Sequence, residues 1–220
     1  QDSKRQDFER TTPVANASGN ANNKAAVAAS KPLELARARL MAGDYEAAEK
    51  EALKALKLDP QSVDAETVLA VSAARRGDSA EAGRHYQRAA ELAPNNGAAQ
   101  NTYGVWLCGE GGAAESLAWF DRALKDPRYT TPSVALANSG SCAARAGQDE
   151  RARRDLRRAI ELEPNNAVAL GALAELEFRQ GNAFEARAFP ERRLAAAPAD
   201  AQALQLASQI EHKLGDTAAA

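Results

Sequence analysis

Two cysteines and two histidines are the side chains with the widest chemical range in this sequence. Cys108 follows Trp106 in the stretch NTYGVWLCGEGGAAES, and the other cysteine is Cys142. A thiol can be a nucleophile, a metal ligand, a buried apolar side chain or half of a disulfide. His85 and His212 stand apart, so no Cys/His cluster has zinc spacing and no histidine is placed beside Cys108 as a base. These residues do not favour nucleophilic or metal chemistry.

The glycine cluster GEGG at residues 109–112 resembles a phosphate-binding loop only in its glycine content. It lacks the lysine and the preceding strand of a P-loop, so we expect a turn between two helices. From the whole set of candidate residues we predict no catalytic site, no metal, no cofactor and no small-molecule substrate. The protein is therefore predicted not to be an enzyme.

Charged and aromatic side chains offer further candidates. Four arginines crowd one predicted helix, and three acidic residues are interleaved with them: Arg151, Arg154, Arg157, Arg158, Glu150, Asp155 and Glu161. An acidic partner that docks on these arginines is one interpretation. We expect instead a solvated face on which the arginines form salt bridges with the interleaved carboxylates. Trp106 and Trp119 are expected to pack between helices, Trp106 with partial exposure. His85, just before the core position Tyr86, is expected to be exposed.

The composition suits stacked helices. Hydrophobic residues make up 45% of the 220 residues and aromatic residues only 5%, with much of the apolar content in alanine, the strongest helix former. The net charge is −2, from 28 basic and 30 acidic residues. That balance gives no electrostatic signature of nucleic-acid or anionic-membrane binding. No apolar run approaches the ~18 residues that a membrane-spanning helix needs.

Residues 1–30 have no apolar periodicity and are rich in Asn, Ser, Ala and charge, which predicts a flexible N-terminal tether. Pro32 is expected at the first position of a helix that continues through LELARARLM. The sequence does not begin with methionine, so we expect a processed chain that starts after any signal peptide or lipid-attachment residue.

Glycine and proline each recur with a period of about 34 residues. Glycines fall at intervals of 34, 34, 36, 34 and 34 residues, at Gly43, Gly77, Gly111, Gly147, Gly181 and Gly215. Prolines mark a second phase, at Pro60, Pro94, Pro164 and Pro198. Glycine supplies the left-handed conformation that ends a helix, and proline cannot continue one. Each period therefore divides into helix, glycine turn, helix and proline turn.

Small residues keep the same register, at Ala48, Ala82, Ala152 and Ala186 and at Ala55, Ala89, Ala123 and Ala159. This 34-residue helix-turn-helix pattern resembles the tetratricopeptide repeat. The resemblance implies an all-α fold, a right-handed superhelical array of about six repeats, in one domain at residues 31–220. The repeats are placed at about 29–62, 63–96, 97–132, 133–166 and 167–200, with the first helix of a sixth at 201–214.

The first helices of such arrays line a concave groove that recognises a peptide or protein segment. The predicted groove residues are Thr67, Val71, Arg75, Asn101, Val105, Cys108, Ser141, Arg145, Glu175 and Arg179. Some family members clamp a C-terminal carboxylate with Lys and Asn, but here only Asn101 fits, so we disfavour such a clamp. The convex face and the loop 125–133 remain alternative binding surfaces.

The register also bears on Cys108 and Cys142, which stand in neighbouring first helices. Stacked helices bring these faces together, within the roughly 7 Å between Cα atoms that a disulfide needs. Two buried free thiols are the alternative. Oxidation would indicate a periplasmic or secreted setting.

Two departures from the pattern predict local differences. The third repeat is two residues longer, and the extra length falls in the loop 125–133, which we expect to project from one edge. Pro190 stands inside the predicted second helix of the fifth repeat, where an interior proline costs about 3 kcal/mol. We expect a kink or an early end near Phe189.

Several motifs resemble a particular family, the PilF/PilW family of type IV pilus biogenesis and stability lipoproteins. They are YGVWLC, the F-x-x-A-L-K-D-P-x-Y segment from Phe120 to Tyr129, the T-P that follows, and N-x-G-x-C from Asn138 to Cys142. The ELEPNN, ALAELEFRQG and EARAF stretches continue the likeness, which covers about residues 33–214.

The resemblance implies a lipoprotein on the periplasmic face of the bacterial outer membrane. It implies a pilotin that binds subunits of the type IV pilus secretin, aids their insertion and assembly, and is anchored by an N-terminal lipid not present in this sequence. The alternative is a generic tetratricopeptide adaptor or co-chaperone of another envelope or secretion complex. The redox state of Cys108 and Cys142 would discriminate between the two, because free thiols in periplasmic material would count against the envelope reading.

Overall fold

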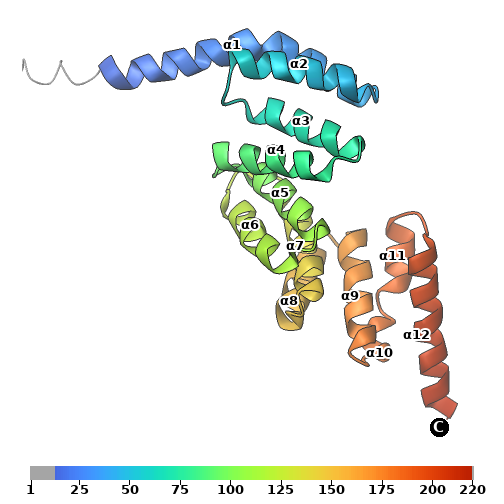
Figure 1. The fold of residues 1–220 in the computed structure, drawn as a ribbon. Coiled ribbons are helices and arrows are strands. Elements are labelled where there is room, and N and C mark those ends of the chain that lie inside the picture. Colours follow the sequence, from blue (N-terminus) through green and yellow to red (C-terminus); the bar gives the residue numbers. More distant parts are fainter. Residues whose placement is uncertain (1–12, 220) are drawn as a thin grey trace, which may run out of the picture. The chain divides into compact units, whose positions relative to one another are not determined.

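The computed structural model describes residues 13–219 of the chain, and within this range all regular structure is helical. The helices are α1 Pro13–Met41, α2 Tyr45–Leu58, α3 Val63–Arg75, α4 Ser79–Leu92, α5 Gly97–Gly109, α6 Ala113–Lys125, α7 Pro132–Arg145, α8 Asp149–Leu162, α9 Ala167–Arg179, α10 Ala183–Ala186, α11 Pro190–Ala196 and α12 Ala201–Ala219 (Figure 1). Between Ala93 and Pro94 the chain divides into two compact units.

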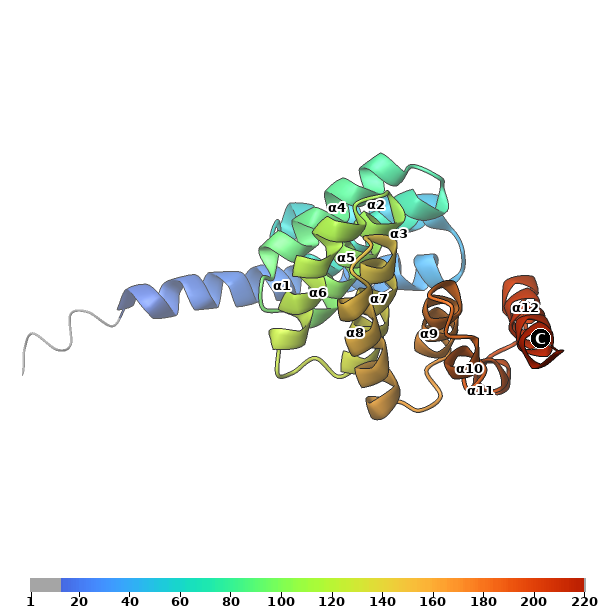
Figure 2. The same ribbon diagram turned by 90° about the horizontal axis from the view of Figure 1, so that it is seen from below.

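Consecutive helices pair into hairpins, α1 with α2 and α3 with α4 in the first unit, and α5 with α6 and α7 with α8 in the second (Figures 1 and 2). Five glycines make the turns within the predicted periods, and their φ angles of +74° to +93° lie in the left-handed region that favours glycine. Gly215 is different, because it lies inside α12, which continues past the predicted end at residue 214.

Acidic side chains after the turn glycines begin two of the helices. The carboxylate of Asp44 accepts a hydrogen bond from the backbone N–H of Ala47 at 3.1 Å, and Asp78 accepts from Glu81 at 3.0 Å. These bonds satisfy backbone donors that a helix start leaves unpaired. Asn182 also precedes a helix, but its side-chain amide donates to Glu177 instead.

Alanine forms the contact between paired helices, as the spacing predicts. The alanines at the two repeated offsets are at most 2% exposed: Ala48, Ala55, Ala82, Ala89, Ala123, Ala152, Ala159 and Ala186. In the second unit, Phe120, Leu156 and Leu173 fill the space beside them and belong to one buried cluster. Burial of each such side chain contributes about 1.5–3 kcal/mol.

Glycines in two first helices receive the large side chains of the helices that follow. A Cβ at Gly104 of α5 would lie 2.9 Å from Phe120 Cε1 of α6. At Gly140 of α7, the equivalent atom would lie 2.5 Å from Leu156 Cγ of α8. Both hairpins therefore close through the same contact of glycine with a large apolar residue, which requires the absence of a side chain.

The first helix begins earlier than the sequence predicts. The tether was expected at residues 1–30 with a helix start at Pro32, but α1 begins at Pro13 and contains Pro32 in its interior. Residues 1–12 lie outside the described residues. The helix persists through Pro32 because Ala29 is buried in a cluster with Ala55 and Ala65 and packs beside Leu33. This packing offsets the hydrogen bond that proline removes.

The fifth hairpin is interrupted where the sequence predicts. The short helix α10 ends at Ala186, and Pro190 begins α11 as its first residue. The N–H groups of Ala188 and Phe189 bond carbonyls three residues back, each at 3.3 Å. The predicted early end near Phe189 is confirmed, since proline suits the first position of a helix but not its interior.

Candidate protein-binding site

The predicted groove residues lie on first helices of both units. Thr67, Val71 and Arg75 are on α3 of the first unit, while five others are on α5, α7 and α9 of the second: Asn101, Val105, Ser141, Arg145 and Glu175. Arg75 is exposed, whereas Thr67 and Val71 are half-buried. The Thr67 hydroxyl donates to the Val63 carbonyl at 2.8 Å, so it is already paired with its own helix.

In the second unit an amide pair joins α5 to α7. The Asn138 side chain donates through Nδ2 to Oδ1 of Asn101 at 3.1 Å, and both residues are half-buried. The hydroxyl of Ser141, one turn further along α7, is buried and has no hydrogen-bond partner among the described residues. Asn138 was not among the predicted groove residues, although it stands in the N-x-G-x-C motif.

Cys108 and Cys142 also join α5 to α7, and the structure contains a disulfide between them with Cα atoms 6.0 Å apart. Both are buried in the cluster that contains Phe120 and Leu156. Cys108 is therefore covered rather than groove-facing. The guanidinium of Arg145 lies beside the disulfide, with its Nη1 3.8 Å from the Cys108 sulfur.

Two predicted residues border a real cleft. Glu175 and Arg179 on α9 face α12 across a hollow of about 420 Å³. The remaining lining residues are Phe178 on α9 and Gln202, Gln205, Leu206 and Gln209 on α12. Arg179 also pairs with Asp149 at 3.1 Å. The sequence did not predict the contribution of α12, because the position of the last helix depends on how the interrupted hairpin packs.

Exposed apolar residues complete the surface of the first helices in the second unit. Val105 is 45% exposed on α5, and Val134 on α7 and Val168 on α9 are also exposed. Val134 and Val168 were not predicted. Each is the second residue of its predicted repeat, so the repeat register could have identified both positions. The result is a surface that mixes valine with amide and charged groups.

The arginines of α8 are engaged with carboxylates of α8 itself and of the neighbouring helices α6 and α9. Arg151 pairs with Asp121 at 2.7 Å and with Asp155 at 3.3 Å, and Arg153 pairs with Glu177 at 2.8 Å. Exposed Arg158 pairs with Glu161. This face is salt-bridged, as predicted.

Glu177 is the most deeply buried carboxylate of this network. Burial alone would raise its pKa, but hydrogen bonds from Arg153 and Asn182, with the charges of Arg153 and Arg157, hold the pKa of Glu177 below its ordinary value. Asp155, also buried, accepts from the Ser139 hydroxyl at 2.8 Å. These acidic residues therefore bind α8 to its neighbours.

The predicted exposure of His85 is wrong. Its Nδ1 lies 2.7 Å from Oε2 of Glu66, a buried carboxylate on α3, and the imidazole is only partly accessible. A local pattern could not show this contact, which joins residues 19 apart in the sequence. Among the described residues, His, Cys, Asp and Glu side chains do not gather into a group that could hold a metal ion.

Only part of the loop 125–133 projects from the edge of the array as predicted. Asp126 accepts hydrogen bonds from the backbone N–H of Gly97 and of Arg128, each at 2.9 Å, and these bonds hold its pKa below the ordinary value. A Cβ on Gly97 would lie 2.7 Å from Cβ of Tyr129. Asp126 and Tyr129 thus fold back onto the start of α5, because that helix start needs an acceptor. Pro127 and Arg128 are exposed.

Within residues 13–219, none of the helices combines the length and the apolar character that crossing a bilayer requires.

Comparisons with known proteins agree with this architecture. Family models of the tetratricopeptide repeat match residues 33–97 and 134–166. No curated protein sequence matches the chain. The 34-residue helical hairpins and these models define the class: the fold is an all-α tetratricopeptide-repeat fold, as predicted.

Solved structures narrow the class further. The crystal structure of PilW, a widely conserved type IV pilus biogenesis factor, is 30% identical, with a TM-score of 0.78 over 86% of each chain. PilF of Pseudomonas aeruginosa is 23% identical, with a TM-score of 0.77 over 86% of each chain. YrrB, a repeat protein with an unusual peptide-binding site, is 20% identical, with a TM-score of 0.64 over 79% of this chain and 89% of its own. The chain belongs to the tetratricopeptide-repeat family of PilW.

Proposed function

We propose that this chain is a pilotin, a non-enzymatic scaffold that binds subunits of the type IV pilus secretin and assists their assembly and outer-membrane insertion. The observation that carries the proposal is the 30% identity to PilW over 86% of both chains, since PilW is a type IV pilus biogenesis factor. Tetratricopeptide repeats act in general as protein-interaction scaffolds, which favours binding over catalysis.

The proposed location is the periplasmic face of the outer membrane, with an N-terminal lipid as anchor. The pairing of Cys108 with Cys142 supports an oxidising compartment, because disulfides persist there and are rare in the cytosol. The proposed anchor would keep the repeat units close to the membrane in which the secretin assembles.

The proposed docking surface is the exposed side of the first helices. In the second unit it presents Val105, Arg145 and Glu175, and in the first unit Arg75. A protein segment that lies along such a surface buries the valines and pairs with the scattered charges. Few of these contacts are expected to dominate the affinity, as in most interfaces.

Capture of purified secretin subunits tests this function. Val105→Glu places a charge on the proposed surface, and Leu162→Glu at the end of α8 is the matched control, because the two side chains are 45% and 46% exposed. We expect wild type and Leu162→Glu to capture secretin equally, and Val105→Glu to bind about tenfold more weakly, as for an interface hot spot. Equal capture by Val105→Glu would exclude this surface. Absence of capture by wild type would favour an adaptor of another envelope complex.

A further inference from the structure

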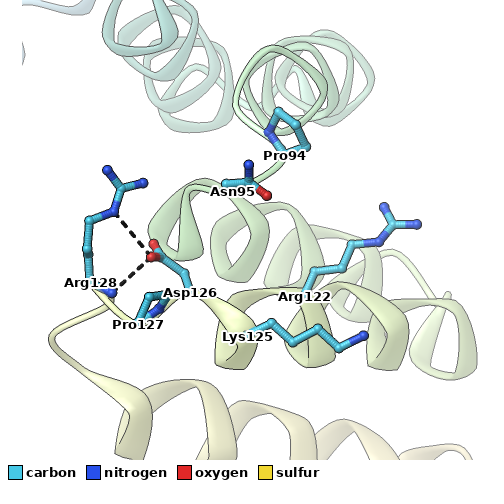
Figure 3. Close-up of a pocket in the computed structure, with 7 residues that line it drawn as sticks. All are labelled: Pro94, Asn95, Arg122, Lys125, Asp126, Pro127 and Arg128. Atoms are coloured by element: carbon cyan, nitrogen blue, oxygen red, sulfur yellow. Dashed lines mark hydrogen bonds and ion pairs between the residues drawn. The ribbon is translucent and has the colours of Figure 1, made fainter.

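A basic hollow lies on the second unit, between the start of α5 and the end of α6. It has a volume of about 520 Å³ and is lined by Pro94 and Asn95, which precede α5, by Arg122 and Lys125 at the end of α6, and by the loop residues 126–128 (Figure 3). The two prolines give it rigid apolar walls, and Asn95 adds an amide. Three cationic side chains surround the hollow, with one carboxylate.

The carboxylate offsets one of the three cations, so the hollow keeps a net positive charge. One oxygen of Asp126 accepts a backbone N–H bond from Gly97. The other accepts from the backbone of Arg128 and lies 3.5 Å from Nε of Arg128 (Figure 3). The bond to Gly97 holds the loop against the start of α5. Arg128 is largely exposed, so most of its donors remain accessible.

Arg122 and Lys125 lack carboxylate partners among the described residues, in contrast to most arginines of α8. The guanidinium of Arg122 lies over the ring of Trp119, 4.3 Å from the ring centre, which orients the side chain and leaves its N–H donors free. Lys125 is exposed. Both residues favourably oppose the dipole at the end of α6, but that interaction does not use their hydrogen-bond donors.

A second hollow continues from the first. Its volume is about 410 Å³, and it shares Asp126 and Arg128 with the basic hollow. Its other walls are neutral, from Asn96, Ala98 and residues 129–131. Two consecutive hollows suit an extended chain, which can place an acidic side chain in one and hydrogen-bond its backbone in the other. A single phosphate or lipid headgroup would occupy only the basic one.

We infer that these two hollows form a docking site for an acidic, extended peptide segment of a protein partner, with Arg122, Lys125 and Arg128 as the carboxylate-binding groups. This inference rests on the proposed function as a protein-binding scaffold and adds a second surface to it. Charge complementarity and the two-part shape carry the assignment. Binding is expected to weaken as salt increases, because the cations are exposed.

A random peptide library selected on the immobilised chain tests the assignment without a known partner. The site variant is Arg122→Gln/Lys125→Gln, and the control is Arg158→Gln/Lys213→Gln, which removes the same charges from exposed positions on α8 and α12. We expect peptides retained by wild type and by the control to be enriched in Asp and Glu. Individual enriched peptides should bind the site variant about tenfold more weakly.

Three outcomes would overturn the inference. They are retention without acidic enrichment, equal affinity of the site variant, and competition by inorganic phosphate or by phosphatidylglycerol vesicles that removes all peptide binding. The last would assign the cations to a phosphate or a membrane surface. Secretin capture separates this site from the proposed function. Loss of capture by Val105→Glu with unchanged capture by Arg122→Gln/Lys125→Gln would leave the pilotin role intact without the acidic-peptide site.

Discussion

The Cα atoms of Cys108 and Cys142 lie 6.0 Å apart, although 34 residues separate the two cysteines in the chain. That separation is close to the 36-residue spacing of the third and fourth repeats, so each cysteine lies on the first helix of its own repeat. The covalent link therefore joins the third and fourth repeats directly through α5 and α7. It complements the noncovalent Asn101–Asn138 contact between the same two helices.

Removal of this link should destabilise the protein. For Cys108→Ser/Cys142→Ser we expect the free energy of unfolding to fall by about 3–4 kcal/mol, because a bridge across 34 residues restricts the unfolded chain. Denaturant unfolding of wild type and variant without reductant measures the difference. Added reductant should lower the free energy of unfolding of the wild type only. Two free thiols in wild-type protein purified from the periplasm would contradict the prediction.

Gly140 of α7 should not tolerate a side chain. In Gly140→Ala the new Cβ would lie 2.5 Å from Leu156 Cγ and 3.1 Å from the Ala152 carbonyl oxygen, so the hairpin must shift, at a cost of about 1–3 kcal/mol. Gly171→Ala on α9 is the matched control, since its Cβ would meet only Arg193 at 3.6 Å. Alanine there should stabilise the helix by up to about 1 kcal/mol. Thermal unfolding of both variants tests whether Gly140→Ala lowers the stability and Gly171→Ala raises it.

The contribution of Glu177 should depend on pH. Its pKa is lowered in the folded protein, so its carboxylate contributes stability that is fully present above the ordinary glutamate pKa of about 4.3 and is lost as pH falls through the folded value. At neutral pH, Glu177→Gln should lower the free energy of unfolding by about 1–3 kcal/mol, because it weakens charged hydrogen bonds. The difference between wild type and variant should shrink in acid. A difference in the free energy of unfolding that stays constant from neutral pH to acid would contradict the prediction.

Pro190 should limit the helix of the fifth repeat. Phe189, immediately before it, has φ −105° and ψ −32°, in the α region that a following proline disfavours. Pro190→Leu restores a backbone donor, and we expect α10 and α11 to join across residues 187–189. Far-ultraviolet circular dichroism should show more helix, and amide exchange should slow at residues 187–190. Unchanged exchange there would show that packing, rather than proline, interrupts the helix.

Much of the fold follows from short-range patterns in the sequence. The intervals between glycines predict the turns, and the predicted repeats begin close to the starts of α3, α5, α7, α9 and α12. The alanine spacing identifies the helix contacts. Local patterns succeed here because each repeat is one hairpin whose neighbours are adjacent in the sequence. The predicted end of the tether was wrong because packing of Ala29 and Leu33 extends a helix through Pro32. A local sequence pattern does not show that contact.

The sequence by itself determined the repeat class, its register, the interruption at Pro190 and the candidate first-helix residues, because turn glycines, prolines and alanine spacing act within single hairpins. Only the tertiary structure decided which side chains meet. It joined His85 to Glu66, Asn138 to Asn101 and Arg153 to Glu177, and it folded Asp126 and Tyr129 onto the start of α5. These contacts join residues 19 to 37 positions apart, or complete a helix start with a distant acceptor. They depend on the stacking of whole hairpins, which sets side-chain distances that periodicity alone does not contain.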